Sequence, residues 1–444
     1  MNLPTRACLV AVASVVITGC QTYRPKPLAD KNIIDSVLTE RNRIPATPNV
    51  PLTIEEAAAW MDEFNPELRQ IRTRYAQLSA LAELKTPIPN PTLGAGLARA
   101  FRLSPAEASR TQPFVELGFT VPLGNKRVIE DDLRTANAEL ARTEILVRHR
   151  ELFLELRKAY YEYASAQARF EEFGKLLGDA ERFQKATQLL AEAGSLTGLD
   201  VGMADMEIGR LELDRSRLEE DVRLARSELA TVIGVQSAKL AGRRAARLVV
   251  DGFPTADQQV ALMRKHQPGL ARLKSEYAIA ELELKLEIAK QYPDLEIGSS
   301  AEQEPGEPTR IFGLGAAITL PVFDKNEIGI RQADNRRELL RAEFGAHAAE
   351  VLSQLDGVMA RAETLATRQA ILEERLLPTA RRNQETAEQM LEAGRLDVLR
   401  YLEISRGVRE LELEIIELRG ERATTILELE RLIGAPLNEK DKEL

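Results

Sequence analysis

The side chains that most often carry catalysis or hold metals are sparse in this 444-residue sequence. Its three histidines are too far apart for a helical His-x-x-x-His pair: His149, His266 and His347. Its two cysteines, Cys8 and Cys20, provide neither a disulfide framework nor a cysteine zinc site. Adjacent acidic residues, as at Glu171 and Glu172, lie in charged helical stretches and indicate solvated faces. The sequence therefore predicts no catalytic residue, no metal site and no enzyme.

Cys20 is the residue for which the sequence predicts covalent chemistry. A basic residue, Arg6, precedes an apolar run over residues 7–17, as in a secretory signal peptide. The sequence Ile17-Thr18-Gly19-Cys20 resembles the bacterial lipoprotein box, in which the cysteine is acylated and becomes the first residue of the mature chain. The alternative is an ordinary signal peptide with an incidental cysteine. We expect residues 1–19 to be a lipoprotein signal peptide and Cys20 to carry lipid, with no other cofactor.

The residues after Cys20 predict where the protein resides. Gln21 follows the cysteine, where an aspartate would retain a lipoprotein in the inner membrane, so the resemblance points to the outer membrane. Buried acyl chains contribute about 0.8 kcal/mol per CH₂, so several chains would anchor the protein stably. Residues 20–51 carry several prolines and lack helical periodicity, which predicts a lipidated, extended N-terminal tether.

The rest of the chain consists of two similar halves. Four motifs recur in the same order at a spacing of about 200 residues, which indicates a tandem duplication. The matching pairs are Asn65-Pro66-Glu67-Leu68 with Gln267-Pro268-Gly269-Leu270, Thr120-Val121-Pro122-Leu123 with Thr319-Leu320-Pro321-Val322, Glu192-Ala193-Gly194-Ser195-Leu196 with Glu392-Ala393-Gly394-Arg395-Leu396, and Val232-Ile233-Gly234-Val235 with Leu432-Ile433-Gly434-Ala435. We expect a first structural repeat over residues 52–250, a second over 251–437, and a C-terminal tail over 438–444.

Each half ends in two very long helical segments. No proline occurs between Pro122 and Pro254, and only Pro378 occurs between Pro321 and Pro436. A proline inside a helix costs about 3 kcal/mol or more, so its absence permits great length. Apolar residues also recur at heptad spacing, as in a coiled coil: Leu133, Leu140, Val147, Leu154 and Tyr161. The predicted long helices are about residues 125–192, 199–234, 326–392 and 397–434.

Each half also contains two strand-like segments, in which apolar residues alternate with small or polar ones. The predicted strands are about residues 91–101, 112–122, 293–302 and 310–321, each about as long as a tilted outer-membrane strand. Half-buried strands of soluble proteins alternate in the same way. Four strands cannot close a barrel, and open sheet edges are excluded from hydrocarbon. Either the strands lie outside the membrane, or several chains share one barrel, which three chains would complete with twelve strands.

These features together resemble the TolC-type outer-membrane factor family over about residues 50–437. The resemblance rests on the duplicated layout, the lipoprotein box, the Asn65-Pro66-Glu67-Leu68 motif, and the Gly-x-Leu turns at 194–196 and 394–396. The segment 320–326, Leu-Pro-Val-Phe-Asp-Lys-Asn, is most similar to the lipoprotein members attached to heavy-metal exporters, the CzcC-like branch.

The resemblance implies a fold that is mainly α with a small β part. The expected protomer is TolC-like and duplicated, with four strands and very long coiled-coil helices. It implies a homotrimer that forms a 12-stranded barrel and an α-helical tunnel. The implied partners are a periplasmic adaptor (membrane fusion) protein, an inner-membrane transporter that is proton-driven, and outer-membrane lipid.

The resemblance also assigns roles to the reversals between paired long helices. They become periplasmic tips that dock the adaptor: Gly194, Ser195, Leu196, Gly394, Arg395 and Leu396. The residue types agree, because glycine tolerates the positive φ that a tight reversal between helices requires. A docking surface at these tips is therefore the prediction.

The residues near the tips allow two interpretations each. Asp200 and Asp397 suit the start of the returning helix as caps or dipole partners, or they line an aperture. Arg400 stands where family members often carry a further acid, so Asp397 against Arg400 would form a salt-bridged gate. Gly178 and Pro378 occupy matching heights and predict either a bend that narrows the tunnel or simple packing kinks, with ordinary shorter helices as the alternative to one long helix.

Charge and composition complete the functional prediction. The net charge of −9, from 60 basic and 69 acidic residues, disfavours a general nucleic-acid binder. An aromatic share of 5% is typical of long helices rather than of a thick core. We expect a passive outer-membrane duct of a tripartite efflux system, anchored by lipid and extending into the periplasm. The alternatives are a structural periplasmic coiled-coil lipoprotein and the outer-membrane duct of a polypeptide (type I) secretion system.

Overall fold

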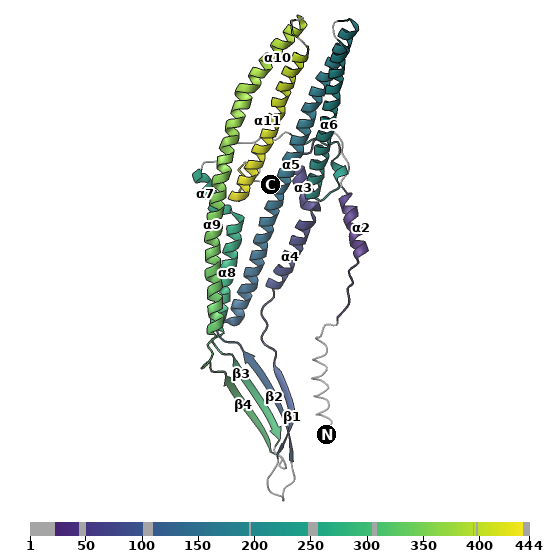
Figure 1. Ribbon diagram of the computed structural model, residues 1–444. Coiled ribbons are helices and arrows are strands. Elements are labelled where there is room, and N and C mark those ends of the chain that lie inside the picture. The colour runs from purple at the N-terminus through teal and green to yellow at the C-terminus, as the bar shows by residue number, and fades with distance from the viewer. Residues whose placement is uncertain are drawn as a thin grey trace. The chain divides into compact units, whose positions relative to one another are not determined.

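The computed structural model describes residues 23–43, 50–100, 110–194, 197–246, 256–303, 309–393, 395–396 and 398–437. The chain divides into two compact units, Met1–Pro45 and Ala46–Leu444. The first contributes helix α2, and the second contributes all the other described helices and strands. The α-helices and strands are labelled in Figure 1.

The first unit corrects the prediction of an extended tether. Its described part contains α2 (Asp30–Arg41), which begins with an acidic residue and ends with a basic one, as the helix dipole favours. The prolines on either side, Pro27 and Pro45, leave this stretch free to form a helix. Its apolar residues recur at helical rather than random spacing, and all four are exposed: Ile33, Ile34, Val37 and Leu38.

In the second unit, each repeat begins with two short helices separated by a capping residue. The first repeat has α3 (Ile54–Phe64) and α4 (Pro66–Ala82), and the second has α7 (Ala256–His266) and α8 (Pro268–Ala289). The Asn65 side chain accepts hydrogen bonds from the backbone N–H groups of Glu67 and Leu68 at 2.9 and 3.1 Å. Gln267 accepts one from Leu270 at 2.5 Å. The proline after each cap suits the first helical position, because it has no N–H to satisfy.

The strands of the two repeats form one antiparallel sheet of four strands in chain order. They are β1 (Thr92–Ala100), β2 (Arg110–Val121), β3 (Leu295–Gln303) and β4 (Arg310–Ile318). In the register, Leu93 lies opposite Leu117, which lies opposite Ser299, which lies opposite Leu314. The first and second repeats therefore meet along β2 and β3. Among the described residues, no strand pairs with the outer edge of β1 or of β4.

The two faces of this sheet differ in chemistry. One face exposes large apolar side chains: Leu93, Leu97, Val115, Phe119, Phe312, Leu314 and Ile318. The other face carries glycines and carboxylates: Gly94, Gly96, Gly118, Gly298, Gly313, Gly315, Glu116, Glu296 and Glu302. Because side chains alternate between the faces of a strand, the register keeps most of the large apolar residues of the four strands on one side, whereas Phe114 and Ile311 lie on the other.

The long helices lie side by side in Figure 1, with one antiparallel pair from each repeat. The first pair is α5 (Lys126–Glu192) and α6 (Gly198–Ile233), followed by the short η1 (Ser237–Leu240). The second pair is α9 (Glu327–Ala370) continued through η2 (Ile371–Leu376) and α10 (Leu377–Glu392), against α11 (Val398–Ile433). At 1.5 Å per residue, the 67 residues of α5 extend about 100 Å. Contacts between α5 and α11 join the repeats.

The second repeat departs from the predicted single helix over residues 326–392. The segment Ile371–Leu376 is a π-helix that ends two residues before Pro378. Proline has no N–H to donate to the carbonyl four residues earlier, and its ring crowds that carbonyl, so the preceding turn widens. The first repeat has no such change, because α5 continues through Gly178 without a break.

The repeated motifs meet at the end of the last helix of each repeat. Gly234 and Gly434 have φ values of +92° and +77°. A Cβ atom on Gly434 would lie 2.2 Å from the carbonyl oxygen of His266, and one on Gly234 would lie 2.6 Å from that of Phe64. In the first repeat the Asn65 side chain also donates to the carbonyl of Val232 at 2.7 Å. The Ile-Gly motif and the capping motif are therefore two sides of one contact.

We predict that Gly434→Ala destabilises the protein, because the added methyl group meets the His266 carbonyl at a positive φ. Overpacking of this kind costs about 1–3 kcal/mol. A Cβ atom on Gly407, within the helix α11 that ends just before Gly434, would meet nothing within 4 Å, and the φ of Gly407 is not positive. Gly407→Ala should therefore stabilise by about 0.5–1 kcal/mol. Denaturant melts followed by circular dichroism would measure both, and an equal loss in the two variants would contradict the prediction.

Candidate functional site

The predicted tips lie at the reversals between the long helices. Gly194 follows α5 with a φ of +76°, and its N–H donates to the carbonyl of Ala191 at 3.0 Å. A Cβ atom on Gly194 would meet nothing within 4 Å, so the turn is open on this side. Ser195 and Leu196 lie outside the described residues. At the first reversal, the long helix α5 is thus followed by a glycine with positive φ, and no other described part of the chain covers this glycine.

The second reversal joins α10 to α11. The Arg395 N–H donates to the carbonyl of Met390 at 2.8 Å, and Leu396 is half-buried. Gly394 and Asp397 lie outside the described residues, as does Cys20. The docking role of the tip residues stays a prediction.

The predicted aperture residues are not brought together as a described gate. Asp200 lies in the first turn of α6. The Arg400 guanidinium instead pairs with the carboxylate of Glu403 at 2.5 Å, one turn further along α11, and both side chains are exposed. The charge of Arg400 is therefore already offset within its own helix. Its pairing with Asp397 stays a prediction.

A charged network between the repeats was missed in the sequence. Arg409 on α11 reaches Glu172 and Asp179 on α5 at 2.9 and 3.3 Å, and it also pairs with Glu412 at 2.7 Å. Closer to the tips, Arg406 on α11 pairs with Glu207 on α6. These contacts join the second helix pair to the first, in the halves of α5, α6 and α11 that lie nearer the tips. The prediction of a solvated face is wrong for Glu172, whose paired side chain is only 14% exposed. Charged residues on helices usually indicate solvated faces, so no local pattern marks these residues as partners.

The repeats are also joined by a buried ion pair. Arg157 on α5 pairs with Glu430 on α11, and the two side chains are 5% and 2% exposed. The other carboxylate oxygen of Glu430 accepts the N–H of Leu437 at 2.9 Å. The guanidinium also lies 6.0 and 5.9 Å from the ring centres of Phe153 and Tyr161. Such a pair is stable in the interior only because hydrogen bonds replace lost hydration.

A second buried arginine attaches the start of the second unit to the helices. The side chain of Arg243 is fully buried. It binds both carboxylate oxygens of Glu56, at 3.0 and 2.6 Å, and donates to the carbonyls of Val50 and Pro51. It also stacks over Trp60, 5.2 Å from the ring centre. One guanidinium therefore fixes the chain segment before α3.

Two tyrosines of α5 complete this attachment. The hydroxyl of Tyr160 donates to the carbonyl of Leu52 at 2.5 Å and accepts from the N–H of Ala246 at 2.8 Å. The hydroxyl of Tyr163 donates to the carbonyl of Arg243 at 2.6 Å. Burial raises the pKa of Tyr160 to about 12, so it remains a neutral donor at physiological pH.

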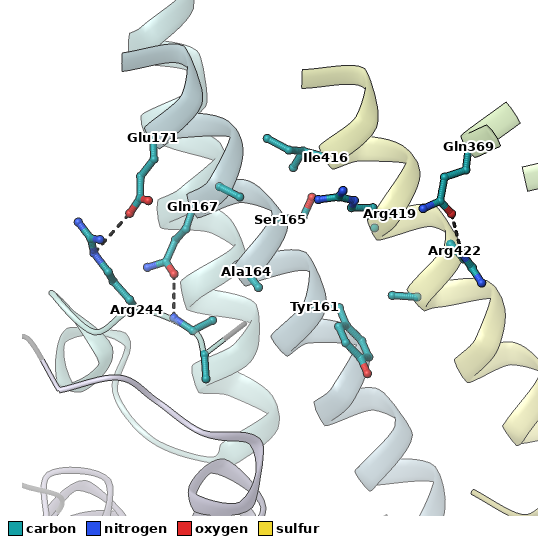
Figure 2. A pocket seen from close by; sticks show the side chains of 15 residues that line it. Tyr161, Ala164, Ser165, Gln167, Glu171, Arg244, Gln369, Ile416, Arg419 and Arg422 are labelled. Carbon is teal, nitrogen blue, oxygen red and sulfur yellow. Dashed lines mark hydrogen bonds and ion pairs between the residues drawn. The ribbon is translucent and has the colours of Figure 1, made fainter. Parts of the chain in front are cut away.

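Figure 2 shows a pocket of about 790 Å³ at the seam between the repeats, lined by α5, α11, Gln369 of α9 and the segment Arg244–Ala246. Its polar groups are bonded to one another. Arg244 pairs with Glu171 at 3.3 Å, and Arg422 donates to Gln369 at 2.6 Å. Arg419 pairs with Glu373 at 2.9 Å. The three arginines of the pocket therefore already have polar partners, and the pocket lining holds no histidine or cysteine.

The described residues provide neither a metal site nor a membrane-spanning helix. No group of three or more histidine, cysteine, aspartate or glutamate side chains among them could hold a metal ion. No described helix is both long enough and apolar enough to cross a membrane.

The duplicated helix pairs, the shared sheet and the paired capping motifs correspond to one known family. The sequence model of the family described as outer membrane efflux protein matches residues 62–235 and 261–435, one segment in each repeat. The chain belongs to this family. It is therefore an outer-membrane channel component of a tripartite efflux system and not an enzyme.

Individual relatives agree with this membership. The cobalt-zinc-cadmium resistance protein CzcC of Cupriavidus metallidurans is 22% identical over 393 residues, which cover 86% of this chain and 90% of that protein. The fold matches the outer-membrane channel OprN with a TM-score of 0.69 at 16% identity, over 94% of this chain and 98% of that one. The outer membrane protein VceC of Vibrio cholerae matches with a TM-score of 0.67 at 15% identity, over 87% and 97%. The TolC-like fold predicted from the sequence is confirmed.

We predict that Glu430→Gln strongly destabilises the efflux protein, because buried Arg157 loses its carboxylate. Breaking a buried pair by removing one partner costs about 3–5 kcal/mol. Glu428→Gln, two residues away on α11 at a half-buried position, is the matched control and should change little. The double variant Arg157→Leu/Glu430→Leu should recover part of the loss. Chemical unfolding would measure the free energies, and equal stability of Glu430→Gln and Glu428→Gln would refute the role of the pair.

Proposed function

We propose that three copies of this chain form one duct through the outer membrane, with their sheets closing a 12-stranded barrel and their long helices a periplasmic tunnel. One observation carries the proposal. The four-stranded sheet has an apolar face, a polar face rich in glycine, and two edges, β1 and β4, that pair with no described strand. Open edges in lipid would leave backbone N–H and C=O groups without partners.

The strand order supports closure by identical copies. The four strands run alternately up and down, so β4 of one copy and β1 of the next are antiparallel when placed side by side. The same pairing can then continue around a ring. Three copies of four strands give twelve, an even number within the range of outer-membrane barrels.

The polar face of the sheet would line the barrel. By the register, its residues include Glu116, Glu296 and Glu302, with Arg110 at the start of β2. A wall of carboxylates and glycines leaves an open, electronegative passage that favours cations. Together with the likeness to CzcC, whose name records resistance to cobalt, zinc and cadmium, this supports a metal-ion efflux system as the one this duct serves.

The proposed partners are a protein that binds the tips and a transporter in the inner membrane. We place a periplasmic adaptor at the reversals around Gly194 and Arg395, and an inner-membrane, proton-driven transporter below it as the source of energy. The duct itself is passive and uses no cofactor. The lipid on Cys20 would anchor the chain to the outer membrane at a residue that precedes helix α2 in the sequence.

The experiment that tests the duct is conductance in planar lipid bilayers, combined with gel migration before and after heating. Heat-modifiable trimers that form pores support the proposal. A monomer that conducts no ions and is extracted without detergent would overturn it in favour of a structural coiled-coil lipoprotein. Channels that form but serve an ATP-driven polypeptide exporter would identify the secretion alternative.

We predict that Gly194→Lys together with Gly394→Lys abolishes export while trimers still form, because bulky charges at the tips block the adaptor. The turn at Gly194 is open, so folding should tolerate the side chain apart from its positive φ. Gly345→Lys on α9, which also meets nothing within 4 Å, is the matched control and should export normally. Metal tolerance of cells and trimer yield are the measurements, and unchanged export in the tip variant would show that the adaptor docks elsewhere.

We predict that Cys20→Ala yields a chain that carries no lipid and is misprocessed, because the acyl groups require the thiol. Mass spectrometry of the N-terminal peptide measures the modification directly. Cys8→Ala is the control and should leave acylation unchanged, since that residue belongs to the predicted signal peptide. Normal acylation of the Cys20→Ala protein would refute the lipoprotein assignment.

A further inference from the structure

The loop after β4 exposes an unusual run of large apolar side chains. Leu320, Val322 and Phe323 are 70%, 65% and 101% exposed, respectively. The base of the loop is fixed to its own chain, because the Asn326 side chain donates to the Glu287 carbonyl at 2.9 Å and Gln291 donates to the Lys325 carbonyl at 3.0 Å. The loop is therefore held in place while its apolar part has no cover.

The first repeat shows what the equivalent loop does. The loop after β2 packs against the segment that leads into β3 of the same chain. The N–H of Leu123 donates to the Asp294 carboxylate at 3.4 Å, and Lys126 pairs with the same carboxylate at 2.7 Å. A Cβ atom on Gly124 would lie 3.1 Å from Tyr292. This contact follows from the antiparallel pairing of β2 with β3, in which Val121 lies opposite Leu295.

Because the two repeats are similar, an equivalent contact would form where β4 of one copy pairs with β1 of the next. Val121 corresponds to Leu320 through the Thr-x-Pro motif, and Pro293-Asp294-Leu295 corresponds to Pro91-Thr92-Leu93. Pairing β4 with β1 of the next copy in the same register would place Leu320 opposite Leu93. Both belong to the apolar face, so the register keeps that face continuous around the ring. The loop after β4 then lies against residues 87–91 of the next copy.

The segment that leads into β1 offers a matching surface. Ile88 is 63% exposed. The segment before it is held by α5, because the Asp131 carboxylate accepts both the N–H and the hydroxyl of Thr86 at 2.8 and 2.7 Å. The hydroxyl and then the N–H of Thr86 lower the pKa of Asp131, which keeps it an acceptor. Ile88 is thus presented from a fixed position.

The junction within the chain and the proposed junction between copies differ in which segment carries the aromatic side chain. Within the chain, the small Gly124 meets the ring of Tyr292. At the junction between copies, Asn90 takes the position of Tyr292. The loop after β4 is also two residues longer between its proline and Asn326, which has a positive φ like Asn125. This longer loop contains Phe323. The aromatic ring comes from the segment before the strand in one case and from the loop in the other.

We propose that Phe323 of one copy packs against Ile88 and the flanking prolines of the neighbouring copy, and that this contact fastens successive protomers where the barrel meets the tunnel. The inference rests on the proposed homotrimer and assigns a pair of residues to its interface. A second copy is favoured over lipid as the occupant, because Asp324 and Lys325 directly follow Phe323 and would have to enter the membrane with it.

The test is disulfide cross-linking of the full chain with Ile88→Cys and Phe323→Cys combined. Both positions are exposed within a single chain, so folding should not depend on them. Copies in contact as proposed bring the two cysteines within disulfide range, which requires a Cα separation of about 4.4–6.8 Å. After oxidation, most of the protein should migrate as covalent dimers and trimers on a non-reducing gel, and reduction should restore the monomer.

Matched variants separate the contact from chance collision. Each single cysteine variant should give no ladder of covalent dimers and trimers. These variants also control for cross-linking through the thiol of Cys20. Ile88→Cys with Phe312→Cys, a residue of the apolar face near the start of β4, should give no covalent dimers or trimers either. Leu123→Cys with Tyr292→Cys, at the junction within the chain, should give no covalent multimers.

The outcomes distinguish this inference from the proposed function. Absence of the ladder in a preparation that still runs as heat-modifiable trimers would overturn the Phe323 contact and leave the trimer standing. Absence of trimers in the unmodified protein would overturn the proposed assembly itself. A fluorophore on Phe323→Cys that is quenched by nitroxide-labelled lipid chains would place the side chain in the membrane and also overturn the contact.

Discussion

The seam between α5 and α11 holds the two repeats together, and the buried pair of Arg157 with Glu430 lies within it. In the sheet, the repeats meet through β2 and β3, and among the helices α5 contacts both α8 and α11 of the second repeat. A buried ion pair contributes little net stability compared with apolar packing, but it penalises any arrangement in which its partners separate. The two helix pairs are thereby fixed in one register, from which the Arg409 network extends toward the tips.

The duplication made much of this architecture predictable. The capping motifs, the Ile-Gly helix ends and the strand pairs could be found in the sequence because each is local and occurs twice. The contact of Gly434 with the His266 carbonyl explains why the two motifs recur together. The family resemblance inferred from these motifs is confirmed, whereas the roles of Cys20 and of the tip residues stay predictions.

The features that could not be predicted from the sequence depend on contacts between distant residues or on a local change in helix geometry. Arg157 and Glu430 are 273 residues apart, and nothing in either local pattern marks them as partners. Arg243 looks like a surface residue in the sequence, but it is buried because a carboxylate and two carbonyls replace its water. The π-helix before Pro378 could be expected only as a bend, since proline can equally kink a helix or widen the preceding turn. Helix α2 is hard to predict because the prolines around it outweigh its short apolar pattern.

The three prolines before β1 have a consequence for the open edge of the sheet. In a single copy, the sheet has an apolar face and two edges, β1 and β4, that pair with no described strand, and such edges recruit foreign strands. Pro87, Pro89 and Pro91 cannot donate backbone hydrogen bonds, so they stop the edge of β1 from lengthening toward the helices. The edge that is open to pairing is thereby limited to β1 itself, Thr92–Ala100.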